Sequence, residues 1–146
     1  MTMRTEAGED LVRRIERLEA IEEIKQLKSR YARACDPRHD VETLLSLFTD
    51  DAVFSVERFG RYEGKAAIRE FLEGADDIVP WALHYMIAPV VEVSDDRRSA
   101  RGTWYLWEPA KMPRPPRGDI EAFWIAGVYE DELVRESDGW RFKSVS

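Results

Sequence analysis

Side chains that titrate near neutral pH are few in this sequence of 146 residues, which has only two histidines and one cysteine. His84 begins an apolar stretch, and Asp36 stands directly before Pro37. Taken singly, Asp36 is interpreted as a residue of a helix-terminal turn and His84 as a packed core histidine. A carboxylate that contacts one ring nitrogen of a histidine fixes its tautomer and leaves the other nitrogen free to accept a proton. The elements that carry the two residues decide whether they can meet.

The other reactive side chains are predicted to be structural or solvated. His39 lies in a charged segment and is expected to be a solvated loop residue. Cys35 has no predicted basic partner to lower its pKa, which favours a small packing residue over a thiol nucleophile. Glu108 precedes a predicted loop, so we expect it at the solvated rim of a cavity. Arg135 flanks a turn and is expected to be exposed.

A long amphipathic helix is predicted to carry Asp36 at its end. From about Glu9, apolar residues recur at steps of three and four, namely Leu11, Ile15, Leu18, Ile21, Ile24, Leu27, Tyr31 and Ala34. A proline cannot continue a helix, and it disfavours helical geometry in the residue before it. Tyr31 lies on the apolar face, where core packing and a catalytic hydroxyl are both open interpretations. Residues 1–8 are expected to be a flexible N-terminus, and residues 9–146 a single domain.

Two short helices and a series of strands are predicted to follow. Helices are expected over residues 41–48, with Asp40 as N-cap, and over 65–74, where a glycine ends the pattern. Between them, alternating apolar residues predict a hairpin that turns at Gly60. The strands of the second half are predicted over residues 84–93, 100–110, 120–136 and 140–146.

The segment 111–119, KMPRPPRGD, contains three prolines and is predicted to be an exposed loop. The order of elements predicts an α+β fold in which the helices pack on one face of a curved antiparallel sheet.

Alternation along the strands predicts which side chains face the hollow of this sheet. If His84 faces inward, so do Met86, Ala88 and Val90. The same rule places alternate residues of the neighbouring strands on the inner face. The pocket that results is mostly apolar, as small-molecule sites usually are. Its predicted substrate-binding residues are Phe54, Val56, Met86, Trp104, Leu106 and Glu108.

Composition restricts the partners. A net charge of −7 argues against a nucleic-acid ligand. No apolar run is long enough to span a membrane, and the N-terminus lacks a secretory pattern. A single cysteine excludes an internal disulfide and a CxxC motif, and we expect neither metal nor cofactor. We therefore expect a cytoplasmic protein that binds an apolar small molecule.

Five segments give the chain a resemblance to a known family: IEEIKQLKSRYARACD, LFTDDAVFSV, YEGKAAIREFL, LHYMIAP and GVYEDELVRESDGWRF. From about Leu11 to Val145 it resembles the SnoaL-like proteins of the NTF2-like superfamily. The resemblance implies a cone-shaped, curved antiparallel sheet wrapped around a long N-terminal helix, with two short helices beside it. Within that group the pattern is similar to three lyases: scytalone dehydratase, hexachlorocyclohexane dehydrochlorinase and bile acid 7α-dehydratase.

The resemblance also implies roles for three residues. It implies that Asp36 turns into the cone and hydrogen-bonds one nitrogen of His84, so we expect the two side chains within about 3.5 Å or one water apart. The other nitrogen would take a proton from a carbon beside the leaving group. Tyr31 matches a tyrosine of the bile acid enzyme and would donate a hydrogen bond to the departing hydroxyl or to a carbonyl.

Two positions depart from these relatives. Val56 stands where ketosteroid isomerases of this fold carry their catalytic Asp, and Ala110 best matches a second histidine of scytalone dehydratase. The resemblance thus implies a cofactor-independent, dehydratase-type elimination on an apolar cyclic or polycyclic hydroxy-carbonyl compound. A non-catalytic ligand-binding or scaffolding protein, and a polyketide-type cyclase or isomerase, remain alternatives. Residues 123–128 are apolar on both faces of their strand, which predicts self-association as a dimer or a trimer.

Overall fold

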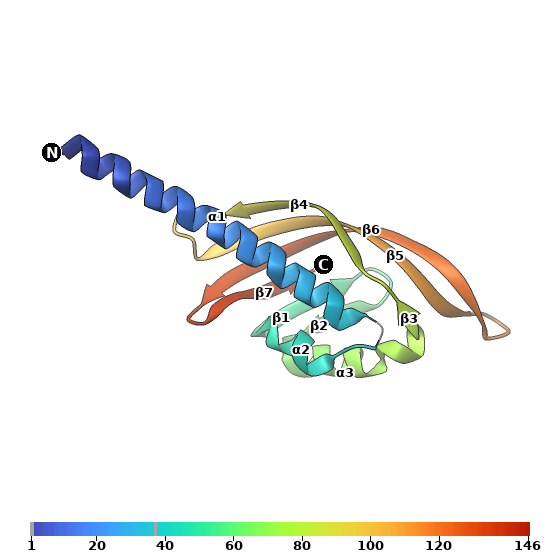
Figure 1. Cartoon of the computed structure of the whole chain (residues 1–146). Helices are drawn as coiled ribbons and strands as arrows, with labels where there is room; N and C mark the ends of the chain where they lie inside the picture. Colours follow the sequence, from blue (N-terminus) through green and yellow to red (C-terminus); the bar gives the residue numbers. More distant parts are fainter. Residues whose placement is uncertain (1, 37) are drawn as a thin grey trace.

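A long helix and a strongly curved sheet form the frame of the molecule (Figure 1). The computed structural model describes residues 2–36 and 38–146, with side chains from residue 6 onward. Helix α1 spans Thr2–Cys35, so it begins upstream of the predicted start at Glu9 and ends where the sequence predicts. Helices α2 and α3 span Val41–Ser46 and Gly64–Ile78.

The strands form one seven-stranded sheet in the order β2-β1-β7-β6-β5-β3, with β4 also paired to β5. Their bounds are β1 Phe48–Val56, β2 Gly60–Glu63, β3 Trp81–Ala82, β4 Tyr85–Val93, β5 Ser99–Arg114, β6 Asp119–Glu136 and β7 Gly139–Val145. The sheet is mixed and open, because β1 pairs with β7 in parallel. The prediction of a purely antiparallel sheet is wrong at this one pairing, since alternation within a strand carries no information on the direction of its partner.

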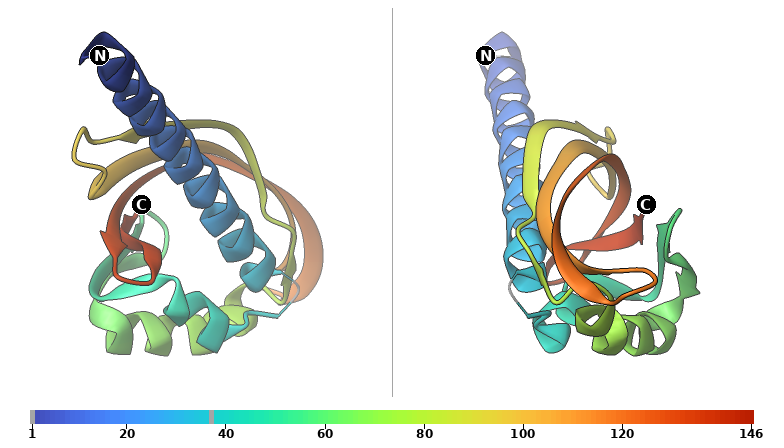
Figure 2. Two further views of the ribbon diagram at one scale, coloured as in Figure 1. Left: turned by 60° about the vertical axis from the view of Figure 1, so that its left-hand side comes forward. Right: turned by 90° about the vertical axis from the view of Figure 1, so that its right-hand side faces the viewer.

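The core lies where the second half of α1 meets the hollow of the sheet, and α2 and α3 close one end of that hollow (Figure 2). Ile24 and Leu27 of α1 are fully buried there, against Phe48 of β1 and Phe142 of β7. The first half of α1 extends beyond the sheet and leaves apolar side chains such as Leu18 exposed. Within the described residues, no helix combines the length and the apolar composition that crossing a membrane requires.

The predicted loop over residues 111–119 is mostly strand. β5 continues to Arg114 and pairs there with Asp119 of β6, so only four residues remain in the turn. Pro113 lies past the last residue of β5 that pairs with β3, Lys111, and so occupies a free strand edge. A proline is tolerated at an edge because its missing N–H leaves no ladder partner unsatisfied.

Two further differences change which side chains face inward. In β4 the register shifts between Ile87 and Val90, and Ala88 has a positive φ of 51°. This bulge reverses the alternation, so Ala88 and Val90 point outward and the inward prediction for both is wrong. Helix α3 continues past Gly74 to Ile78, because buried Ala75 continues its packed face. Asp40 caps α2 as predicted, by accepting a hydrogen bond from the Thr43 N–H at 3.1 Å.

Candidate functional site

A cavity of about 130 Å³ lies inside the cone, between the end of α1, the inner face of the sheet and α3. Most of its wall is apolar, and the polar groups that reach it are few. Its described lining includes Tyr31, Cys35, His39, Phe54, Val56, Arg58, Phe71, His84, Leu106, Glu108, Ile125 and Tyr129. An apolar pocket with a few converging polar groups is the usual form of a small-molecule site.

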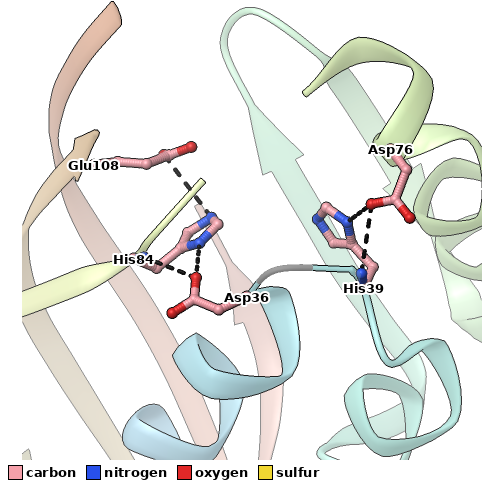
Figure 3. Close-up of polar contacts among 5 residues, drawn as sticks. All are labelled: Asp36, His39, Asp76, His84 and Glu108. Atoms are coloured by element: carbon pink, nitrogen blue, oxygen red, sulfur yellow. Dashed lines mark hydrogen bonds and ion pairs between the residues drawn. The ribbon is translucent and has the colours of Figure 1, made fainter. Parts of the chain in front are cut away.

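Asp36 and His84 meet at the wall of this cavity (Figure 3). Oδ1 of Asp36 lies 2.9 Å from Nδ1 of His84, and it also accepts a hydrogen bond of 2.9 Å from the His84 backbone N–H. Since an ionised carboxylate only accepts hydrogen bonds, Nδ1 carries the proton and Nε2 is left as the acceptor. The predicted contact is therefore present, and both residues are held by the ends of the elements that carry them.

Glu108 stands across from His84 on the neighbouring strand. Because Tyr85 pairs with Trp107, the residue opposite His84 is Glu108, whereas Ala110 pairs with Ala82. Oε2 of Glu108 lies 3.8 Å from Nε2 of His84, and only 9 % of its side chain is exposed. The expected position at a solvated rim is wrong, because β5 continues past Glu108 and the side chain is buried beside His84 inside the cone. Burial raises the pKa of this carboxyl, and the charge of His84 opposes that effect.

This burial predicts a pH-dependent stability. The folded-state pKa of Glu108 is raised, so the folded chain holds its proton better than the unfolded chain and loses stability as pH rises above the ordinary value of 4.5. Glu108→Gln should therefore raise the melting temperature at neutral pH by a few degrees, or roughly 1 kcal/mol. Scanning calorimetry at pH 4 and pH 7.5 should show the gain only at the higher pH. Glu92→Gln, at an exposed position of β4, is the control, and an equal gain in both variants would contradict the assignment.

Tyr31 packs in the core and also reaches the cavity, so both positions that the sequence leaves open for it are found. Its ring is 3 % exposed and packs edge-on against Phe48, Tyr129 and Phe142, while the residue also lines the cavity. Burial, and then the neighbouring Tyr129 and Cys35, raises the pKa of Tyr31 well above its ordinary value. The hydroxyl is therefore a protonated hydrogen-bond donor at the cavity wall.

The predicted pocket residues divide into two groups. Phe54, Val56, Leu106 and Glu108 line the cavity, and Met86 and Trp104 do not. Helix α1 fills the cone at the level of these last two, so Met86 packs on the core and Trp104 is 2 % exposed. Neither residue therefore lines this cavity.

A second histidine–aspartate pair was not predicted from the sequence. Nδ1 of His39 lies 2.8 Å from Oδ1 of Asp76, and the His39 side chain is only 13 % exposed. The expectation of a solvated loop residue is wrong, because α3 extends past Gly74 and brings Asp76 beside the segment that joins α1 to α2. A helical period that continues beyond the glycine, through Ala75 and Ile78, is the sequence signal for this extension.

A buried ion pair was missed as well. Nζ of Lys28 lies 2.7 Å from Oδ2 of Asp131, with side-chain exposures of 1 % and 0 %. The ammonium group also lies 3.6 Å from the ring centroid of Tyr129 and 4.6 Å from that of Tyr31, so it supports two residues of the cavity wall. Arg135, by contrast, is exposed as predicted and pairs with Glu23 on the surface at 3.6 Å.

Comparison with known proteins agrees with this architecture. The profile of the SnoaL-like domain matches residues 16–146, so the chain belongs to this family. Its fold is that of the NTF2-like, or cystatin-like, proteins. A search of curated proteins gives no match.

Three solved structures illustrate the similarity. A protein of Novosphingobium aromaticivorans, provisionally named an aromatic ring hydroxylase, is 26 % identical over 88 % of this chain and 87 % of its own, with a TM-score of 0.77. LinA is 23 % identical over 91 % of this chain and 87 % of its own, with a TM-score of 0.76. A provisionally named scytalone dehydratase of Novosphingobium aromaticivorans is 20 % identical over 92 % and 85 %, with a TM-score of 0.74.

Proposed function

We propose that this protein is a cofactor-independent lyase that removes water from an apolar cyclic or polycyclic hydroxy-carbonyl compound. The observation that carries the proposal is the 2.9 Å contact between Asp36 Oδ1 and His84 Nδ1 at the wall of an apolar cavity. Because Asp36 holds the Nδ1 proton, Nε2 is the nitrogen that can act as a base toward a bound molecule.

The reaction begins with removal of a proton from the carbon beside the carbonyl group. Nε2 of His84 accepts this proton, and the electron pair of the C–H bond moves toward the carbonyl oxygen. Tyr31 donates a hydrogen bond to that oxygen, which stabilises the negative charge that develops there. Asp36 and Glu108 lie on the two sides of the His84 ring and neutralise the imidazolium that forms.

The wall of the cavity supports the substrate class. Phe54, Phe71, Leu106 and Ile125 offer apolar surface for a hydrocarbon ring system, and His84 with its contacts Asp36 and Glu108 forms a polar end. A substrate whose hydroxyl group stands on the ring carbon β to the carbonyl, next to the carbon that loses the proton, would place its reacting atoms at the polar end.

A panel of β-hydroxy ketones on single and fused rings, incubated with the protein in D₂O, tests the proposal. Mass spectrometry follows loss of water, and proton NMR follows deuterium exchange at the carbon beside the carbonyl. A compound that stabilises the protein against heating and undergoes neither exchange nor loss of water would favour a non-catalytic binding role instead.

We also propose that the outer face of the sheet associates with a second copy of the chain. Large apolar side chains lie exposed on neighbouring strands there: Tyr85, Ile87, Tyr105, Trp107, Trp124 and Val128. The rings of Trp107 and Trp124 stack at 5.4 Å, which makes a rigid aromatic surface in the middle of the face. Contiguous exposed apolar surface of this kind marks interaction sites in monomers.

Light scattering at ~50 µM, above typical dissociation constants for oligomers, should give the mass of a dimer or a trimer. Trp124→Glu should shift the protein to monomers, because it places a charge on a side chain that is 69 % exposed in the single chain. Ala66→Glu, on the exposed side of α3, is the matched control and should leave the mass unchanged. A monomeric wild-type protein would contradict the proposal.

A further inference from the structure

Two histidines with the same supporting geometry face one cavity. His84 and His39 each hold an aspartate oxygen with Nδ1, at 2.9 Å and 2.8 Å. Both residues line the cavity, and Figure 3 shows their rings on opposite sides of the space between them. In each ring the aspartate fixes the proton on Nδ1, so Nε2 is the nitrogen available to a ligand.

The second pair is fixed in place by the elements around it. His39 lies between α1 and α2, and its backbone N–H also reaches Oδ1 of Asp76, at 3.5 Å. The next residue is anchored at both ends, because the Asp40 N–H donates to the Ala34 carbonyl at 2.8 Å and the Asp40 side chain caps α2. Asp76 belongs to α3. The pair is therefore held between two elements, although the side chain of Asp76 is more exposed than that of Asp36, at 46 % against 21 %.

Loss of water needs a proton donor as well as a base, and the other candidates are poorly suited. Glu108 lies 3.8 Å from Nε2 of His84, so an acidic proton there would pass to the base before it reached the substrate. The Tyr31 hydroxyl has a pKa well above its ordinary value and is a weak acid. His39 lines the same cavity, and Figure 3 shows its ring apart from that of His84 and held by its own aspartate, so a substrate bound between the two rings would separate its proton from the base.

On the basis of the proposed function, we propose that His39, held by Asp76, is the acid that protonates the departing hydroxyl group. Nε2 of His84 takes the proton of the C–H bond to give the enolate, whose electron pair then returns from oxygen to form the new C=C bond. The C–O bond breaks with its electron pair on oxygen, which takes the Nε2 proton of His39, a ring that starts as the imidazolium with a proton on each nitrogen, and leaves as water. His84 then carries one proton more and His39 one fewer, and exchange with water restores both. Acid and base on opposite walls suit groups that leave from opposite faces of the ring.

The test compares His39→Gln with His84→Gln on the compound of the β-hydroxy ketone panel that the wild-type protein converts. His39→Gln should lower loss of water by roughly 10²- to 10⁴-fold, the range for loss of a general acid, and should retain deuterium exchange beside the carbonyl. His84→Gln should lose both. Asp76→Asn should show a weaker form of the His39 pattern, and the exposed neighbour Asp77→Asn is the matched control with unchanged rates.

A second substrate separates acid catalysis from a structural role. The same ketone with chloride in place of the hydroxyl group needs no proton on its leaving group, so His39→Gln should eliminate chloride at close to the wild-type rate. The acid role is overturned if His39→Gln removes water at the wild-type rate, or if it loses exchange and chloride elimination as well. A wild-type protein that catalyses neither exchange nor elimination would instead overturn the proposed function, and the acid role with it.

Discussion

Replacing His84 with Gln is expected to lower turnover by roughly 10²- to 10⁴-fold, the range for loss of a general base. Gln can still donate a hydrogen bond to Asp36 through its amide, so the contact between α1 and the start of β4 is largely kept. What it cannot do is accept a proton from carbon at neutral pH. Steady-state rates measured with the converted ketone, together with circular dichroism and melting temperature, separate the loss of chemistry from a loss of fold.

Replacement of Asp36 tests whether this residue and His84 act as one unit. Asp36→Asn removes the charge that holds Nδ1–H, and we expect a loss in the same range, because the ring is freed to present the wrong nitrogen. Residues that act as a unit give non-additive losses, so the double variant should be hardly slower than His84→Gln alone.

Tyr31→Phe should lower turnover less than His84→Gln, since the ring stays packed against Phe48 and Phe142. A folded His84→Gln protein with the wild-type rate would remove this residue from the chemistry.

Local sequence signals were sufficient for the frame of this fold. The period of α1 and the proline after Asp36 determine where that helix ends, and both signals are independent of the rest of the chain. The strands also alternate as expected until Ala88, where the bulge before Pro89 reverses the faces. The strand propensities of single residues cannot reveal such a bulge, because the bulge depends on how β4 must bend to follow β5.

The site was only partly predictable, because several of its members depend on contacts between distant segments. The position of Glu108 follows from the register of β4 on β5 and from the true length of β5, and neither is visible in single strands. His39 enters the cavity because α3 packs beyond Gly74, which is a tertiary effect that overrides the local preference of glycine. Met86 and Trp104 lose contact with the cavity because α1 occupies their end of the cone.

The largest effect on stability is expected at Lys28. Lys28→Met should lower the free energy of unfolding by about 3 to 5 kcal/mol, because it leaves the charge of Asp131 buried without its partner. Burial already raises the pKa of Asp131 to about 6, even with Lys28 beside it. Urea unfolding should therefore show a penalty that shrinks as pH is lowered, since protonation removes the unpaired charge. Arg101→Met, at an exposed surface pair with Glu132, the neighbour of Asp131 in β6, is the matched control and should cost less than about 1 kcal/mol.

The double variant Lys28→Met with Asp131→Leu measures the net contribution of the buried ion pair to the free energy of unfolding. Replacement of both charges by apolar groups of similar size removes the desolvation cost together with the attraction, and such exchanges are often neutral or stabilising. We therefore expect the double variant to recover most of the loss and to lose the pH dependence of the single variant. The Tyr31 and Tyr129 rings would keep an apolar contact in place of the ammonium group, so turnover should fall far less than with His84→Gln. A single variant no less stable than Arg101→Met would show that the two buried charges do not form a pair in the folded protein.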